Sequence, residues 1–240
     1  CIRDRTQNDQ KNQIKQHECA AAALTGNIGE LPHVADADGA ARGKQDEAQA
    51  GLQGFSFHDS INSLFPISDD TVQVLKENVT CCHFPKKYQL IKADTYCKSA
   101  FFIEKGITRS FWLVDGEEVT TSFAGEGSIV FSMDELYYGK ISEEFVETLE
   151  EVEAYRIPLA TLTHLFETNI ELCNWGRIIH QNEYRRLHRS HKDHLTLSAR
   201  ERYEAFKEQF PDAYRRVNLG YIASYLGIRL STLSRLRANG

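Results

Sequence analysis

The sequence lacks the features that mark several classes of protein. It contains no apolar run near the roughly 18–20 residues of a membrane span, and no basic segment followed by an apolar core opens the chain. We therefore expect neither a membrane helix nor a secretory signal. Six cysteines in 240 residues are too few for a disulfide scaffold, so the sequence predicts a cytoplasmic protein in a reducing compartment.

Aromatic side chains are missing from the first part of the chain. Residues 1–54 contain no Phe, Tyr or Trp, yet they hold 6 of the 15 glycines. A segment of this composition cannot bury enough apolar surface to offset the entropy lost when it is ordered. We predict that residues 1–54 are a disordered or non-native extension, and we assign them no function.

The net charge of −6 hides an uneven distribution. Residues 55–160 carry 18 acidic and 9 basic side chains, whereas residues 176–240 carry 13 basic and 6 acidic ones. A basic block in an acidic protein suits a polyanionic partner such as nucleic acid, because each neutralised phosphate releases condensed counterions. A basic surface without a partner explains the same pattern, so charge alone leaves both interpretations open.

Residues 55–168 are predicted to form a β domain. Ser68, followed by two aspartates, indicates a capped short helix. Asp115-Gly116 lies between two β-rich runs and predicts a hairpin, because a type I′ turn needs positive φ at both central positions. Short β-rich runs at close spacing favour a sandwich or barrel. These runs cover residues 101–103, 111–114, 119–123, 128–131, 145–149 and 152–157.

A long helix is predicted from about Ile170 to about His188, within a segment 169–194 that also contains a hinge. Apolar residues recur at three- and seven-residue steps at Leu162, Leu165, Leu172 and Ile179. This stripe suits a dimer seam, and it suits packing against the chain's own β domain equally well.

Residues 195–240 show the pattern of a helix-turn-helix. Ser198 is a candidate helix cap, with Glu201 three residues later. Gly227 can adopt the left-handed conformation that ends a later short helix. The second helix of a helix-turn-helix enters the DNA major groove, whereas an ordinary helical hairpin would leave its arginines in solvent. The predicted buried positions are Leu219, Ile222, Ala223, Leu226, Ile228, Leu233 and Leu236.

The exposed face of the second helix carries the candidate DNA contacts. Ser231, Thr232 and Arg235 are predicted to face base edges, and the guanidinium of Arg235 matches guanine O6 and N7. Arg229 and Arg237 flank these residues and suit phosphates.

The C-terminal motifs resemble those of the Crp/Fnr family of bacterial transcription regulators. The resemblance implies an α+β fold: an N-terminal double-stranded β-helix, or jelly-roll-like β-roll, over 55–168, a dimerisation helix and hinge over 169–194, and a winged helix-turn-helix over 195–240. The residues that carry it are 195–203 (LTLSARERY), Phe210-Pro211, Val217, 221–228 (YIASYLGI) and 233–237 (LSRLR).

The same resemblance implies partners. It implies a homodimer that binds a near-palindromic site in double-stranded DNA. Arg235 matches the arginine with which the family reads a base, while Ser231 stands where related proteins often carry Glu. RNA polymerase and an unidentified small-molecule effector are further candidate partners.

Family members that bind cyclic nucleotides use a Gly-Glu-Leu cassette and, about a dozen residues later, an arginine that neutralises the phosphate. Here the cassette aligns with Phe131-Ser132-Met133, and Glu143, followed by Glu144, aligns with the arginine. An alternative register with Asp134-Glu135-Leu136 also lacks an arginine before Arg156. Because carboxylates repel a phosphate, we predict a degenerate pocket that binds cyclic AMP and cyclic GMP weakly or not at all. Phe131 is a candidate to fill it.

No catalytic or metal site and no cofactor are predicted. Cys81, Cys82 and His83 are adjacent, and successive residues of a strand point to opposite faces, which does not suit zinc. His188 and His191 are interpreted as part of a solvated hinge, with pH or metal sensing as the alternative. A cupin-type β-roll enzyme needs two or three barrel histidines, and residues 81–157 contain only His83.

The sequence therefore predicts a sequence-specific DNA-binding transcription regulator that is not an enzyme. The alternative is a ligand-binding β-roll that acts through a protein partner and retains a vestigial helix-turn-helix.

Overall fold

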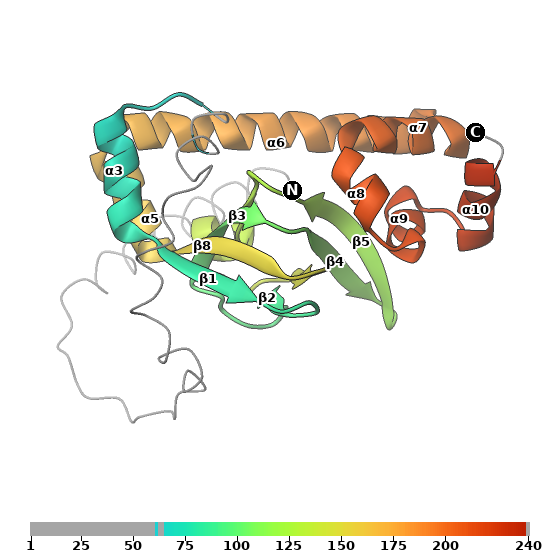
Figure 1. Cartoon of the computed structure of the whole chain (residues 1–240), viewed down its shortest axis with the longest axis horizontal. Helices are drawn as coiled ribbons and strands as arrows, with labels where there is room; N and C mark the ends of the chain where they lie inside the picture. Colours follow the sequence, from blue (N-terminus) through green and yellow to red (C-terminus); the bar gives the residue numbers. More distant parts are fainter. Residues whose placement is uncertain (1–60, 62–64, 239–240) are drawn as a thin grey trace, which may run out of the picture. The chain divides into compact units, whose positions relative to one another are not determined.

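The computed structural model describes Ile61 and residues 65–238. The predicted extension at residues 1–54 lies outside them. The described residues belong to one unit, Glu47–Gly240, which consists of a β-roll with helices before and after it (Figure 1).

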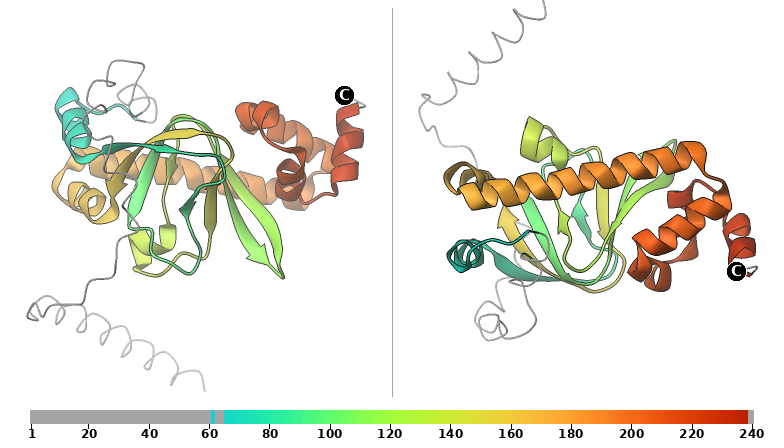
Figure 2. Two further views of the ribbon diagram at one scale, coloured as in Figure 1. Left: turned by 60° about the horizontal axis from the view of Figure 1, so that its bottom comes forward. Right: turned by 90° about the horizontal axis from the view of Figure 1, so that it is seen from above.

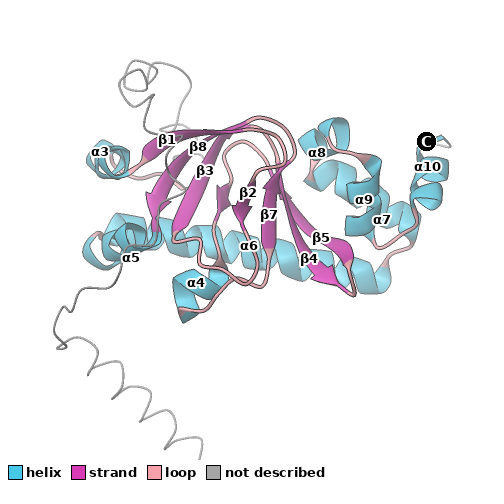
Figure 3. Cartoon of the chain, turned by 90° about the horizontal axis from the view of Figure 1, so that it is seen from below, coloured by secondary structure: helices cyan, strands magenta, loops and turns pink. Residues whose placement is uncertain are grey.

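Two antiparallel sheets form the roll, and within the described residues each has four strands, in the orders β1-β8-β3-β6 and β2-β7-β4-β5. Figure 3 shows the strands of both sheets, with the short helix α4 (Met133–Tyr138) at one rim of the roll. Each β-rich run predicted from the sequence corresponds to one strand, which confirms the predicted β domain. The strands are β1 (Thr80–Phe84), β2 (Gln89–Ile91), β3 (Ser99–Lys105), β4 (Thr108–Val114), β5 (Glu117–Ala124), β6 (Ile129–Val130), β7 (Phe145–Thr148) and β8 (Val152–Pro158).

Strands β4 and β5 form the hairpin that the sequence predicts. Asp115 and Gly116 at its tip have φ values of +52° and +84°, so both turn positions are left-handed. The register shifts between Ser110 and Phe111, which indicates a bulge that bends the hairpin. Strand β5 is an edge strand of its sheet, so part of its backbone has no strand partner.

Helices α3 (Asp69–Asn78), α5 (Leu159–Thr168) and α6 (Ile170–Thr196) flank the roll. Ser68 caps α3 as predicted, since its side chain accepts a hydrogen bond from the Thr71 N–H. Asn169 caps α6 in the same way. Figure 2 shows α6 running alongside the roll.

The predicted apolar stripe of α6 packs against the chain's own roll. Leu172 and Trp175 are almost completely buried in a core that also contains Phe102 of β3, and Ile179 packs on that core. Another face of α6 is exposed and carries Tyr184, Leu187 and Leu195, of which Tyr184 is 72% exposed. The stripe that we considered as a dimer seam therefore belongs to the subunit's own core.

Helix α6 continues to Thr196, and the predicted end near His188 is wrong. Residues after His188 carry no apolar stripe, but neither Gly nor Pro interrupts them, so the backbone hydrogen bonds continue. The helix ends at Leu197 because Ser198 and Glu201 form the predicted capping box of the next helix.

Four helices follow, and they share a core with the roll. Phe123 of β5 lies about 5.8–5.9 Å, ring to ring, from Phe206, Phe210 and Tyr225. Between residues 197 and 238 the regular elements are all helices, so the strands of the predicted wing are not found in that part of the chain. The four helices are α7 (Ala199–Gln209), α8 (Pro211–Arg216), α9 (Leu219–Leu226) and α10 (Leu230–Ala238).

Gly106 and Gly116 both have positive φ, but an added Cβ would clash at only one of them. A Cβ on Gly106 (φ +102°) would lie 2.6 Å from the Glu151 carbonyl oxygen, whereas a Cβ on Gly116 would meet nothing within 4 Å. We predict that Gly106→Ala lowers the free energy of unfolding by about 3 kcal/mol and Gly116→Ala by about 1 kcal/mol, measured by urea unfolding. Equal losses would contradict this account of Gly106.

Candidate functional site

Helices α9 and α10 form the predicted helix-turn-helix. Gly227 has a φ of +63°, and its N–H donates to the carbonyls of Ala223 and Ser224, which ends α9. Ile222 of α9 and Leu233 of α10 are fully buried and hold the two helices together. Leu219, Ile228 and Leu236 are partly buried against the same core, so the predicted buried face is present.

The outward face of α10 contains the predicted base contacts. Ser231 and Arg235 are exposed and lie one helical turn apart, while Thr232 is half-buried. Arg229 precedes the helix and is exposed. Arg237 is also exposed, with its guanidinium 6.0 Å from the centre of the Tyr214 ring. The structure thus leaves all three arginines exposed, with Arg235 on the same helix face as Ser231.

The predicted pocket residues do not all line one site. Ser132 is buried and caps α4 by accepting from the Glu135 N–H. Met133 is half-exposed and Glu143 is exposed. Glu144 is half-buried and accepts from the Thr121 hydroxyl. Phe131 is separate from these side chains and packs toward α6.

The space beside Phe131 is almost filled by the chain itself. Phe131, Leu136, Trp175 and His180 line a cavity of about 10 Å³, which holds at most one water molecule. His180 is fixed there, with its ring nitrogens 2.7 Å from the Tyr137 hydroxyl and 2.6 Å from the Gly176 carbonyl oxygen.

Glu135 has a structural role that the sequence pattern did not show. Its carboxylate accepts hydrogen bonds of 2.7–3.0 Å from the backbone N–H groups of Cys97 and Lys98. In the alternative register Glu135 would be the cassette carboxylate, but here it ties α4 to the loop before β3. The sequence gives no signal for a contact between residues 37 or 38 positions apart.

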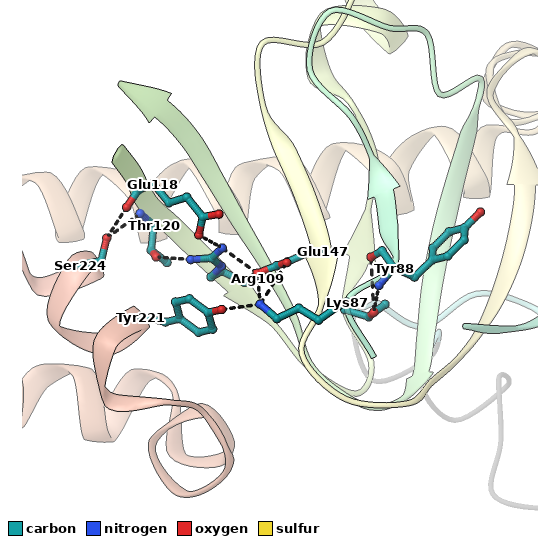
Figure 4. Close-up of polar contacts among 9 residues, drawn as sticks. Lys87, Tyr88, Arg109, Glu118, Thr120, Glu147, Tyr221 and Ser224 are labelled. Carbon is teal, nitrogen blue, oxygen red and sulfur yellow. Dashed lines mark hydrogen bonds and ion pairs between the residues drawn. The ribbon is translucent and has the colours of Figure 1, made fainter. Parts of the chain in front are cut away.

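A buried arginine connects the roll to α9, and sequence reasoning missed it. Arg109 is 1% exposed and pairs with Glu147 at 2.6 Å and with Glu118 at 2.5 Å. Its guanidinium lies 3.8 Å from the centre of the Tyr221 ring. Lys87 bonds to both Glu147 and the Tyr221 hydroxyl. We call these five residues the Arg109 junction; Figure 4 shows it.

A signal for the Arg109 junction exists in the sequence. Arg109 lies in a β-rich run that also contains Phe111, two residues along, and such residues share a face of a strand. A charge on the apolar face of a strand predicts a buried, paired group. The pattern cannot name the partners, because Glu147 and Tyr221 come from distant segments.

Cys81, Cys82 and His83 lie on β1, and Cys81 is exposed. Among the residues that the structure describes, no group of three or more His, Cys, Asp or Glu side chains is placed to hold a metal ion. No helix among them is long and apolar enough to span a membrane.

Comparison with known proteins gives a family match for the roll. The family model described as "Cyclic nucleotide-binding domain" matches residues 71–169. The match spans strands β1 to β8 and helix α5. No curated protein sequence matches the chain.

Solved structures with the same fold include several regulators. One is the c-di-GMP responsive global regulator CLP of Xanthomonas campestris, with a TM-score of 0.58, 15% identity, and coverage of 72% of this chain and 91% of that one. A putative regulator of the Crp/Fnr family from Eubacterium rectale has a TM-score of 0.59, 14% identity, and coverage of 74% and 87%. FixK2 of Bradyrhizobium japonicum has a TM-score of 0.57, 19% identity, and coverage of 67% and 83%. The predicted Crp/Fnr-type fold is confirmed.

The Glu144 side chain lies in a partly buried environment close to Asp134 of α4, and this environment changes its pKa. Burial raises the pKa of Glu144, and Asp134 adds to this, while the Thr121 hydroxyl and Arg186 act in the opposite direction. With a raised carboxyl pKa, the folded state holds more protons than the unfolded state between the unfolded value, about 4.3, and the folded-state pKa. The contribution of Glu144 to stability is therefore full at acidic pH and is lost as the pH rises through the folded-state pKa.

We predict that Glu144→Gln flattens this pH dependence. Gln cannot titrate, but its side-chain oxygen can still accept from Thr121. The variant should gain stability relative to the wild type between pH 4 and pH 7.5, measured by urea unfolding at a series of pH values. Glu143→Gln, at an exposed position, is the control and should leave the profile unchanged. If the wild type and Glu144→Gln showed parallel profiles, the assigned environment of Glu144 would be wrong.

Proposed function

We propose that the chain is a sequence-specific DNA-binding transcription regulator of the Crp/Fnr type, acting in the cytoplasm. The observation that carries the proposal is a helix-turn-helix with Ser231 and Arg235 exposed on its second helix, joined to a cyclic nucleotide-binding domain. The fold shared with the regulators named above supports it.

The chemistry of the exposed face supports DNA as the partner. Arg235 presents a planar guanidinium, which can donate two parallel hydrogen bonds to guanine. Ser231 and Thr232 supply hydroxyls that can accept or donate to either base of a pair. Arg229 and Arg237 are exposed near them in the sequence and can bind phosphates, and residues 176–240 hold 13 basic against 6 acidic side chains.

We propose that the protein acts as a homodimer on a near-palindromic site. Tyr184, Leu187 and Leu195 leave apolar surface exposed on the later turns of α6, whereas Leu172 and Trp175 of its first turns are buried against the roll. A second copy would cover this surface and bring two α10 helices to one side of the pair. RNA polymerase is the further partner through which such a complex would act on transcription.

We propose that the pocket of the cyclic nucleotide-binding domain is degenerate. Phe131 and His180 fill the space beside the first turns of α6, Glu135 is occupied by backbone N–H groups, and Glu143, followed by Glu144, stands where the sequence alignment places the phosphate-binding arginine. None of these side chains is itself the bidentate cation that a cyclic phosphate needs. Any effector would therefore have to differ from cyclic AMP and cyclic GMP.

Arg235→Ala tests the DNA interface. The cognate duplex is first selected from a random pool with the wild-type protein, and affinities are then measured by fluorescence anisotropy. We expect Arg235→Ala to weaken binding by about 1–3 kcal/mol and to relax the preference at one base pair. Arg237→Ala should weaken all duplexes alike and lower the salt dependence by about one phosphate.

The control for Arg235→Ala is Arg156→Ala, an exposed arginine on β8 of the roll, which should bind as the wild type does. An unchanged base preference in Arg235→Ala would refute the base contact. Failure of the wild type to enrich any sequence would refute the proposed function.

Cyclic nucleotides test the pocket. We expect neither cyclic AMP nor cyclic GMP at millimolar concentration to raise the melting temperature, because a ligand stabilises a protein only in proportion to its binding. The selected duplex serves as the positive control in the same thermal-shift assay. A saturable shift with either nucleotide would overturn the degenerate-pocket proposal.

A further inference from the structure

Helix α9 uses one face for α10 and another for the roll. Ile222, Ala223 and Leu226 are buried in the core of the C-terminal helices, which includes Leu233 of α10. Tyr221 and Ser224, three residues apart, turn instead toward the β4–β5 hairpin (Figure 4). The helix that supports the recognition helix is therefore itself attached to the roll.

Ser224 completes the edge of a sheet. Its hydroxyl oxygen accepts from the Thr120 N–H at 3.0 Å, and its O–H donates to the Glu118 carbonyl oxygen at 3.0 Å. These two backbone groups lie on the outer side of edge strand β5, where no further strand pairs. Because the Ser224 hydroxyl bonds to both a backbone donor and a backbone acceptor, it fixes α9 at one position along β5 as well as at one distance from β5.

Tyr221 covers the buried cation of the Arg109 junction. The guanidinium lies between the rings of Tyr221 and Phe111, at 3.8 Å and 4.2 Å from their centres. Stacking on a desolvated guanidinium is strongly attractive and depends on ring orientation. The Tyr221 hydroxyl also bonds to Lys87, so the ring is held at both its face and its tip.

Apolar packing alone would leave the angle of α9 less defined. The aromatic cluster around Phe123 attaches the C-terminal helices to the roll, but apolar contact is non-directional. The polar contacts of Tyr221 and Ser224 are directional, and none of them uses Ser231 or Arg235, which stay exposed. Contact with the roll and contact with DNA are thus on different surfaces.

We propose that Tyr221 and Ser224 are positioning residues that fix the direction of α10 through the β4–β5 hairpin, with no bound ligand required. This inference rests on the proposed function, since direction matters only when two recognition helices must match two half-sites. In a dimer, a fixed angle sets the distance between those helices and therefore the spacing of half-sites.

The test uses the full chain with Tyr221→Ala and Ser224→Ala combined. Duplexes carry two copies of the selected half-site, moved apart one base pair at a time, and a further duplex carries a single half-site. The wild type should prefer one spacing. The double variant should lose about tenfold in affinity at that spacing and bind the other spacings more evenly, while its affinity for the single half-site stays unchanged.

A second measurement reports on the contact without DNA. Hydrogen exchange at the Thr120 amide should become faster in the double variant, because Ser224 no longer accepts from it. Tyr221→Phe is the matched control, since it keeps the ring on Arg109 and should retain the spacing preference. The circular dichroism spectrum of the double variant should match that of the wild type.

Three results overturn the proposal. A double variant that keeps the wild-type spacing preference shows that other contacts set the angle. Equal losses on the single and the paired half-sites show that Tyr221 and Ser224 only stabilise the helix-turn-helix. If the wild type binds no duplex, the proposed function itself is refuted, and the positioning role with it.

Discussion

The burial of one guanidinium constrains how the roll and the C-terminal helices fit together. A buried charge is tolerated only when it is paired and hydrogen-bonded, and Nη2 of Arg109 pairs with Glu147 and Glu118 from its own sheet, although its buried Nε has no hydrogen-bond partner. The sheet does not cover the outer face of the guanidinium, however, and α9 supplies Tyr221 to do so. Because the buried guanidinium has lost its water, protein groups must replace it, and the Tyr221 ring of α9 is one of these partners for the arginine of β4.

Ion pairs at a second place also join the acidic roll to the basic C-terminal region. Arg216 of α8 pairs with Glu126 and Glu150 of the roll. Burial opposes ionisation of Glu126, but the Gly106 N–H and Arg216 outweigh it and lower the pKa of Glu126. These ion pairs neutralise the charge of Arg216 within the chain, whereas Arg229, Arg235 and Arg237 remain exposed near or on α10. Some basic side chains of the C-terminal region therefore pair with the acidic roll, and others remain exposed to solvent.

Two residues near the sequence-predicted pocket make contacts that hold the roll together. Glu135 binds backbone N–H groups, and Phe131 packs with Leu136 against α6. Both arrangements hold α4 against neighbouring segments without a ligand.

Local features were readable from the sequence because they depend on neighbours within a few residues. The hairpin at Asp115-Gly116, the caps at Ser68 and Ser198, and the turn at Gly227 follow from backbone conformation and short-range hydrogen bonds. The helix-turn-helix pattern belongs to this class, and so does the exposed position of Arg235.

Only the tertiary structure decided which faces meet. The burial of Leu172 against the roll and the exposure of Tyr184 depend on where a 27-residue helix lies, which its own periodicity does not specify. The bond between Ser224 and Thr120 joins residues 104 positions apart, and Arg109 finds Glu147 and Tyr221 in separate segments. Such contacts are selected by the packing of the whole chain, so no local pattern of residues contains them.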